Sequence, residues 1–249
     1  EDGYGINIRP LAMFAMRVYE DDPCECFAPK RSKPDAYEDH SDAVIAKMHK
    51  AISIIQFKLE GQDILAHPEY EMNDRLLLDK LDLERGALKI GGQEYPLKDT
   101  NFPTIDPTAP YALSPEEAKV IEGLVSSFVN CEKLQRHIEF IYKKGSMYKY
   151  YNNCLMFHGC IPMEKDGSFT TLNVYGDVCS GKSLFDCCER LARKGRYGEE
   201  GSEERRRGCD FMWYLWCGAK SPLFGKDKMA TFERYFLDDK QTHKEVSDA

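Results

Sequence analysis

The stretch Cys154-Leu155-Met156-Phe157-His158-Gly159-Cys160-Ile161-Pro162 decides the expected fold. Its four mostly apolar residues follow Asn152-Asn153 and precede Gly159, a pattern typical of a short buried strand. The strand would end at His158. Open sheets bind ligands outside the carboxyl ends of their strands, and neutral imidazole is a common metal ligand. His158 is therefore either a metal ligand or a strand-end histidine with satisfied hydrogen bonds.

Composition narrows the class of protein. The chain has 249 residues, enough for one large domain or two small ones. We expect no transmembrane helix, because no run of about 18 apolar residues occurs, and no signal peptide. The net charge of −8 argues against binding to nucleic acid or to an anionic membrane. The chain starts at Glu1 rather than Met, so we expect a processed protein or a part of a longer one.

Ten cysteines are present, but none forms a Cys-x-x-Cys pair. Cys24 and Cys26, even with His40, would give a structural zinc site too few ligands. A chain of this length needs no disulfide framework. We expect reduced thiols in a cytosolic protein, most of them small core residues.

The first half of the chain carries mainly helical patterns. Apolar residues at helical spacing follow a cap at Ser41-Asp42 and end at Gly61. Ser114 and Glu117 form a capping box around Pro115, and the helix they start is expected to run about 40 Å to Lys143-Lys144. Between these helices we expect a hairpin over 88–95 at Gly91-Gly92, a short helix over 73–85 and a loop over 99–113. Residues 11–18 fit either a short helix or a strand.

The second half mixes short strands and helices. Asp166-Gly167 predicts a hairpin turn, with 168–175 as the strand returning from the His158 strand. Residues 147–151 either extend the preceding helix or begin a strand. The remaining segments are expected as a helix over 183–194, a solvated loop or helix start over 199–207, a buried run over 211–216 and a helix over 227–236.

Gly176-Asp177-Val178-Cys179-Ser180-Gly181-Lys182-Ser183 satisfies the P-loop pattern. In a true P-loop, Lys182 would reach the outer phosphates of a nucleotide and Ser183 would hold magnesium. The preceding strand, 170–175, alternates polar and apolar residues, whereas a P-loop strand inside a parallel sheet is nearly all apolar. The competing interpretation is a turn followed by a helix N-terminus, with Lys182 in solvent.

Several stretches together resemble the class III fructose-1,6-bisphosphatases, bacterial enzymes of the calcineurin-like metallophosphoesterase superfamily. The resemblance spans nearly the whole chain and is most specific between Trp213 and Arg234. It rests on the segments 1–7, 9–11, 19–23, 157–162, 212–218, 221–228, 231–235 and 242–245.

The chain departs from the superfamily in its metal-binding motifs. Of the Asp-x-His, Gly-Asp-x-x-Asp, Gly-Asn-His-Asp/Glu, strand-end His and Gly-His motifs, only the strand-end histidine is present, as His158. Gly176-Asp177 lacks the second Asp and lies in the wrong order. The resemblance therefore implies an internal piece of a longer enzyme.

That resemblance implies an α+β fold: part of a metallophosphoesterase β-sandwich core at 145–249 and a largely helical insertion at 1–144. It also implies a cytoplasmic, gluconeogenic enzyme that hydrolyses fructose 1,6-bisphosphate to fructose 6-phosphate at two manganese ions, with His158 as one metal ligand. The binding partner would be the small sugar bisphosphate itself, and the chain would be either a monomer or part of a homo-oligomer. Candidates for binding the second phosphate are Lys220, Lys226, Lys228 and Arg234.

This piece alone is expected to be inactive. Two other functions are kept open. One is a P-loop nucleotide-binding protein that uses Gly176–Ser183. The other is a non-catalytic interaction module that uses the helices starting at Ser41 and Ser114.

Overall fold

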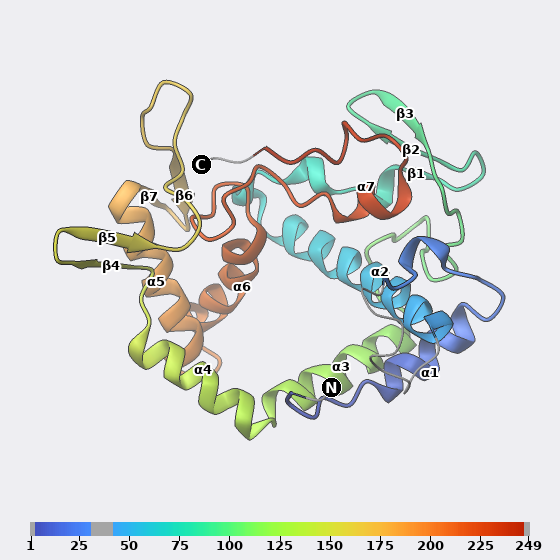
Figure 1. Cartoon of the computed structure of the whole chain (residues 1–249), viewed down its shortest axis with the longest axis horizontal. Coiled ribbons are helices and arrows are strands. Elements are labelled where there is room, and N and C mark those ends of the chain that lie inside the picture. The colour runs from blue at the N-terminus through green and yellow to red at the C-terminus, as the bar shows by residue number, and fades with distance from the viewer. Residues whose placement is uncertain (1–2, 31–41, 247–249) are drawn as a thin grey trace. The chain divides into compact units, whose positions relative to one another are not determined.

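The computed structural model describes residues 3–30 and 42–246 (Figure 1). Two compact units make up the chain. The first combines 1–65, 76–137 and 231–243, and the second combines 66–75, 138–230 and 244–249. Each unit is thus built from separate stretches of sequence. The division expected at 144/145 in the longer protein stays a prediction, and His40 and Ser41 lie outside the described residues.

The first unit is built around helix α2, Asp42–Ala66, the helix expected after Ser41. Ile54, Ile55 and Phe57 are buried on α2. Phe57 meets Phe232 of the short helix α7, Thr231–Phe236, with ring centroids 5.3 Å apart. Helix α1, Arg9–Val18, contacts α3, Pro115–Val129. The helix predicted over 227–236 is confirmed only from Thr231 onward.

Two lysines of α2 are completely buried in this unit. The Lys50 ammonium lies 2.5 Å from Asp22 Oδ2 and 2.6 Å from Asp99 Oδ2. The Lys58 ammonium lies 2.7 Å from Glu117 Oε2 and donates to the carbonyl oxygen of Thr104 at 2.6 Å. Each charge is therefore neutralised by carboxylates of the same unit, as a buried ion requires.

The predicted hairpin at Gly91-Gly92 is confirmed. Strand β2, Ala87–Ile90, pairs antiparallel with β3, Gln93–Pro96, and a short strand β1, Leu81–Asp82, lies on the other side of β2. Both glycines have positive φ, as a two-residue hairpin turn of this hand requires. The helix expected over 73–85 is wrong: this stretch forms 3₁₀ turns at Asn73–Arg75 and Leu78–Lys80 and then β1. No helix or strand lies in 99–113, as expected.

The capping box of Ser114 and Glu117 is present at the start of α3. The single long helix predicted from it is wrong, because α3 ends at Val129 and α4, Glu132–Lys144, begins three residues later. Asn130 bonds back to Ser126 through both its amide and its side chain, which closes α3. Such local side-chain bonds compete with continued helix.

Helices α5, Gly181–Tyr197, and α6, Glu203–Cys217, pack closely in the second unit. Gly195 and Gly208 lie at the contact, where a Cβ atom on Gly208 would stand 2.3 Å from the Gly195 nitrogen. Helix α5 confirms the helix predicted over 183–194, and the stretch 199–207, expected as a solvated loop or helix start, leads into α6 at Glu203. The burial predicted for 211–216 is confirmed only in part, because Phe211 and Tyr214 are buried but Trp216 is exposed.

Two separate antiparallel hairpins complete the second unit. Strand β4, Tyr148–Tyr151, pairs with β5, Cys154–Phe157, and β6, Thr171–Val174, pairs with β7, Asp177–Ser180. The turn at Asp166-Gly167 is present, bridging Met163 and Phe169. The return strand pairs with β7 instead of with the His158 strand, which corrects that prediction. The burial predicted for Cys154–Phe157 is also wrong, because all four residues are exposed.

The fold class α+β is confirmed: helices occur in both units, and the described sheets are small and antiparallel. Within the described residues, no helix combines the length and the apolar character needed to cross a membrane. All ten cysteines are free thiols, and six of them are buried, as expected for small core residues.

Candidate functional site

His158 follows directly after β5 and is exposed. Its position is fixed by the next two residues. Gly159 has a φ of +77°, and a Cβ atom there would lie 2.3 Å from the carbonyl oxygen of Pro222. The amide of Cys160 donates to that same oxygen at 3.0 Å. Only glycine fits this close approach, so the turn after the strand holds His158 beside the loop 221–225.

His158 lines a cavity of about 610 Å³ in the second unit. Three cationic side chains, one carboxylate and several methionines share its wall. These are Lys144, Lys149, Arg193, Glu189, Met147, Met156 and Met212. The histidine is therefore neither a core residue nor packed inside apolar side chains. This placement leaves its imidazole accessible to a ligand in the cavity.

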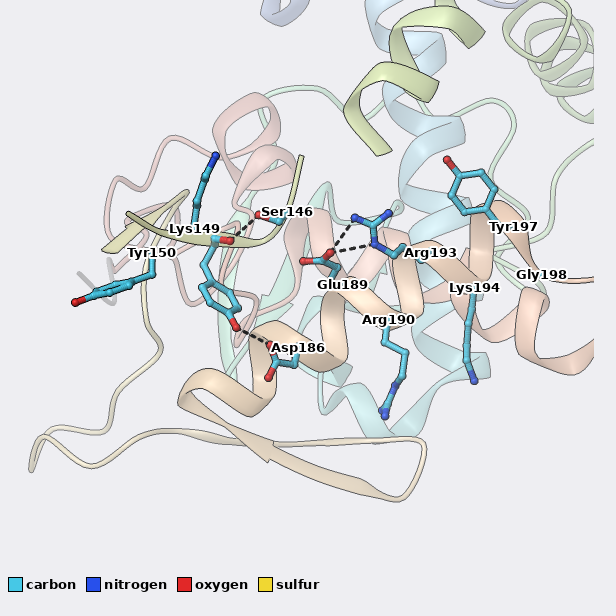
Figure 2. Close-up of a pocket in the computed structure, with 11 residues that line it drawn as sticks. Ser146, Lys149, Tyr150, Asp186, Glu189, Arg190, Arg193, Lys194, Tyr197 and Gly198 are labelled. Atoms are coloured by element: carbon cyan, nitrogen blue, oxygen red, sulfur yellow. Dashed lines mark hydrogen bonds and ion pairs between the residues drawn. The ribbon is translucent and has the colours of Figure 1, made fainter. Parts of the chain in front are cut away.

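An ion pair between Arg193 and Glu189 of α5 lines this cavity, and Figure 2 shows the pair in the neighbouring cavity, which it also lines. Arg193 donates two hydrogen bonds to Glu189 Oε1 and also reaches the carbonyl oxygens of Tyr142 and Gly145 at 2.8 and 3.2 Å. The other oxygen of Glu189 accepts from the amide of Met147. This pair therefore ties the connection between α4 and β4 to α5. The i, i+4 spacing of the pair in a predicted helix was the available sequence signal, and it was missed.

A second cavity of about 880 Å³ shares five lining residues with the first (Figure 2). Its wall carries four cations and two carboxylates: Lys149, Arg190, Arg193, Lys194, Asp186 and Glu189. Arg190 pairs with Asp177 at 2.7 Å and Lys194 with Glu204 at 2.6 Å. A hydrogen bond from Lys182 holds the pKa of Asp186 below its usual value. The cations are thus largely matched by carboxylates of the same unit.

The P-loop pattern does not form a phosphate cradle. Tyr175-Gly176 is a turn, Asp177–Ser180 is the extended strand β7, and α5 begins at Gly181. Lys182 is mostly exposed and bonds Asp186 at 2.6 Å. A hydrogen bond to Asp186 raises the pKa of Lys182. Ser183 Oγ bonds the backbone of Ser180. The nucleotide-binding alternative is wrong, because the residues that would wrap phosphates are paired in a hairpin.

The described lining of the His158 cavity includes Leu223 but none of the four predicted phosphate-binding cations. Lys220 pairs with Glu71 at 3.0 Å and Lys226 with Glu245 at 2.5 Å. Lys228 is partly exposed in the same unit. Arg234 lies on α7 and belongs to the first unit.

The described residues do not fit a complete metal centre. Nowhere in 3–30 and 42–246 do three or more His, Cys, Asp or Glu side chains gather as a metal site requires. The carboxylate in the cavity wall, Glu189, is already used by Arg193. His158 is therefore a single candidate ligand, and metal chemistry cannot be derived from this chain alone.

A buried histidine that sequence reasoning missed lies elsewhere in the second unit. His67 Nδ1 is 3.0 Å from Glu69 and Nε2 is 3.4 Å from Asp210 of α6, while its ring stacks on Tyr70. Both ring nitrogens are thus engaged by carboxylates. This arrangement anchors the segment 66–75 on α6 and leaves no nitrogen open for a ligand.

Comparison with known proteins identifies the family. The profile described as Firmicute fructose-1,6-bisphosphatase matches residues 1–249. The chain therefore belongs to this family. It is 56% identical over 249 residues to the fructose-1,6-bisphosphatase class 3 of Clostridium tetani, covering 100% of the chain and 37% of that relative. The relative from Clostridium novyi is 54% identical over 243 residues, covering 98% and 36%.

These comparisons confirm the resemblance predicted from the sequence. The chain spans a little over a third of the length of the curated relatives it matches. No solved structure matches the chain.

Proposed function

We propose that this chain takes part in hydrolysing fructose 1,6-bisphosphate to fructose 6-phosphate and inorganic phosphate in the cytoplasm. It would do so within a polypeptide as long as its relatives. The observation that carries the proposal is the match along all 249 residues to proteins named for this activity, at up to 56% identity. The chain covers 36–37% of those relatives, so we expect the remaining parts to supply most of the active site.

We further propose that His158 contributes one imidazole to a centre of two manganese ions. Its exposure at a cavity and its fixed position after β5 support this role. The other ligands would come from outside this chain, since the described residues offer no group of three. When bound, such ions polarise a phosphoryl oxygen and activate water.

The finer fold assignment is part of the same proposal. Residues 145–249 would contribute to a metallophosphoesterase β-sandwich, and residues 1–144 would form its largely helical insertion. Lys220, Lys226, Lys228 and Arg234 stay candidates for the second phosphate of the substrate. For Lys220 and Lys226, phosphate would have to replace the carboxylates of Glu71 and Glu245.

A chimera tests the activity. The 249 residues replace the matched stretch in the relative from C. tetani, and manganese-dependent phosphate release is measured for the chimera and for the isolated chain. We expect release by the chimera and none by the isolated chain. Robust release by the isolated chain would contradict the need for the other segments, and an inactive but folded chimera would contradict the activity.

The role of His158 is tested in the same chimera. His158→Ala should lower phosphate release at least about a hundredfold and lower the bound manganese measured by mass spectrometry. His49→Ala is the matched control, because His49 is exposed on α2 in the first unit. Equal activity and equal metal content of the two variants would show that His158 is not a ligand.

A further inference from the structure

The β4–β5 hairpin has one face made entirely of uncharged side chains. Its register places Tyr148 opposite Phe157 and Tyr150 opposite Leu155, so these four residues share a face. The opposite face carries Lys149 and Met156, which line the His158 cavity. Tyr148 and Phe157 of the uncharged face also line the His158 cavity, whereas Tyr150 and Leu155 line only the cavity described next among these two. The hairpin therefore lies between the two cavities and contributes to both.

The uncharged face forms one wall of a third cavity, of about 420 Å³. Phe169 and Phe185 stand on the other side, with the start of α5. Phe185 meets Tyr148 and Phe157 edge to face, at centroid distances of 6.1 and 5.9 Å. Among the described lining residues the one cation, Lys182, is already bound to Asp186. An apolar occupant is thus favoured over a charged one.

The described part of the chain covers this face only in part, through Phe185 against Tyr148 and Phe157. Tyr150 is 63% exposed, Leu155 48% and Phe169 54%. The hairpin is a two-stranded sheet among the described strands, so each strand has an outer edge without a neighbour. A lone hairpin is marginally stable in water, and a contiguous exposed apolar patch marks an interaction surface.

We propose that this face and its cavity bind a β-strand from the part of the polypeptide that the relatives carry outside the matched region. The strand would pair with an outer edge of the hairpin and place an apolar side chain among the rings of Tyr148, Phe157 and Phe185. The relatives have ample chain for this, since 63–64% of their length lies outside the match (100% minus the 37% and 36% covered). The inference rests on the proposed function only in assigning the chain to such a longer phosphatase.

Docking on this face has a consequence for the His158 cavity. The same two strands carry Lys149 and Met156 on the other side and lead into His158. A partner strand that orders the hairpin therefore orders one wall of that cavity. In this proposal the surface acts on the histidine by positioning the strand that leads into it.

Site-resolved alkylation tests the docking. Tyr150→Cys places a thiol on the proposed interface, and Val178→Cys is the matched control, because Val178 is 71% exposed on β7 in the same unit. Iodoacetamide labelling is followed by peptide mass spectrometry, which separates these thiols from the native cysteines. In the chimera with the C. tetani relative, the thiol at position 150 should react at least about tenfold more slowly than in the isolated chain. The thiol at position 178 should react alike in both, and equal rates at position 150 would overturn the proposal.

A second substitution, added to Tyr150→Cys, separates the possible occupants. Leu155→Asp should restore fast labelling at position 150 in the chimera, whereas Leu155→Ile should keep that thiol protected. If the isolated chain dimerises in sedimentation experiments and Leu155→Asp abolishes the dimer, the occupant is a second copy and the proposal is wrong.

Phosphate release is recorded separately, so that docking and activity can fail independently. An active chimera whose thiol at position 150 labels fast would overturn docking alone, and an inactive chimera whose thiol there is protected would overturn the activity alone.

Discussion

The two compact units differ in the side chains that they bury and expose. The first unit hides charge: Lys50 and Lys58 are fully buried, and carboxylates of the same unit lie within 2.7 Å of both. The second unit leaves apolar groups in solvent: the four residues of β5 are exposed, and so are Tyr150 and Tyr151 of β4. In the first unit the charges of both lysines are compensated internally. In the second unit, the described residues leave these apolar side chains of β4 and β5 uncovered.

This difference separates a buried charge that is compensated within its own unit from an apolar hairpin that the described residues leave exposed. A buried ammonium that finds its carboxylate needs no other molecule, whereas an apolar hairpin gains free energy from any surface that covers it. The first unit should therefore respond to changes in its own ion pairs, and the second to changes in close packing and to added partners. Four predictions test that contrast, from the largest expected effect to the smallest.

Lys58→Met should give the largest loss of stability. It leaves the Glu117 carboxylate buried without its ammonium, and breaking such a pair costs about 3–5 kcal/mol. Denaturant unfolding of the isolated chain measures the loss. Lys119→Met on exposed α3 is the control and should change stability by less than about 0.5 kcal/mol. The double variant with Glu117→Gln should recover part of the loss; no recovery would contradict an uncompensated charge as the cause.

Gly208→Ala should give the next largest effect, in the second unit. Its new Cβ would stand 2.3 Å from the Gly195 nitrogen and 2.6 Å from the Leu191 carbonyl oxygen, so α5 and α6 must separate. We expect a loss of about 1–3 kcal/mol, against the gain of helix propensity. Gly123→Ala on α3 meets nothing within 4 Å and should stabilise by about 0.5–1 kcal/mol. Thermal unfolding compares the two variants, and equal changes in melting temperature would show that close packing at Gly208 does not cause the loss.

Acid should weaken the first unit through Asp22. Burial raises the pKa of Asp22, but hydrogen bonds from Lys50, the Cys24 amide and Asn101 outweigh it and hold the pKa below its usual value. As the pH falls, Asp22 is therefore protonated in the unfolded chain before it is protonated in the folded chain. The stability that ionised Asp22 contributes is present above about pH 4 and is lost as the pH falls through the pKa of Asp22 in the folded chain. Asp22→Asn should flatten the decline of stability in acid, measured by unfolding at several pH values. The exposed Asp74→Asn should leave the slope unchanged.

Thiol reactivity should give the smallest effect, with no change in stability. Burial, aided by the nearby Asp22 carboxylate, raises the pKa of Cys24 to about 12, and burial raises that of Cys179 to about 11. In the native chain at pH 8 both should alkylate at least about a hundredfold more slowly than exposed Cys154 and Cys209. Peptide mass spectrometry after brief labelling checks this. Fast labelling of Cys24 would mean that the first unit opens readily.

Local signals allowed much of the fold to be predicted from sequence. The capping box at Ser114, the Gly91-Gly92 turn and the periodicity of α2 each depend on neighbouring residues, and each is confirmed. The two main failures have different causes. The end of α3 at Val129 has a local cause, the bonds from Asn130 back to Ser126, which the apolar periodicity running on to Ile141 concealed. The exposure of the His158 strand has no local signal, because an apolar run does not reveal which partner covers it.

The candidate site shows the same limit. His158 was found because a strand followed by glycine is a local pattern, and the structure places it on a cavity wall. The links from Arg193 to Tyr142 and Gly145 join segments about 50 residues apart, so no spacing rule could reveal them. The predicted group was chosen by closeness along the chain, and the compact units divide it: Lys220, Lys226 and Lys228 belong to the second unit and Arg234 to the first.

Gly159 carries a consequence for how a metalloenzyme could be assembled. The backbone after the histidine is clamped against Pro222 by sterics and one hydrogen bond, both of which exist without any bound ion. The entropy of placing that backbone is therefore lost when the polypeptide folds, not when an ion arrives. If His158 binds an ion as proposed above, the backbone of that ligand is already in position before the ion arrives. A bulkier residue at 159 would displace this backbone and weaken ion binding, although the imidazole itself would be unchanged.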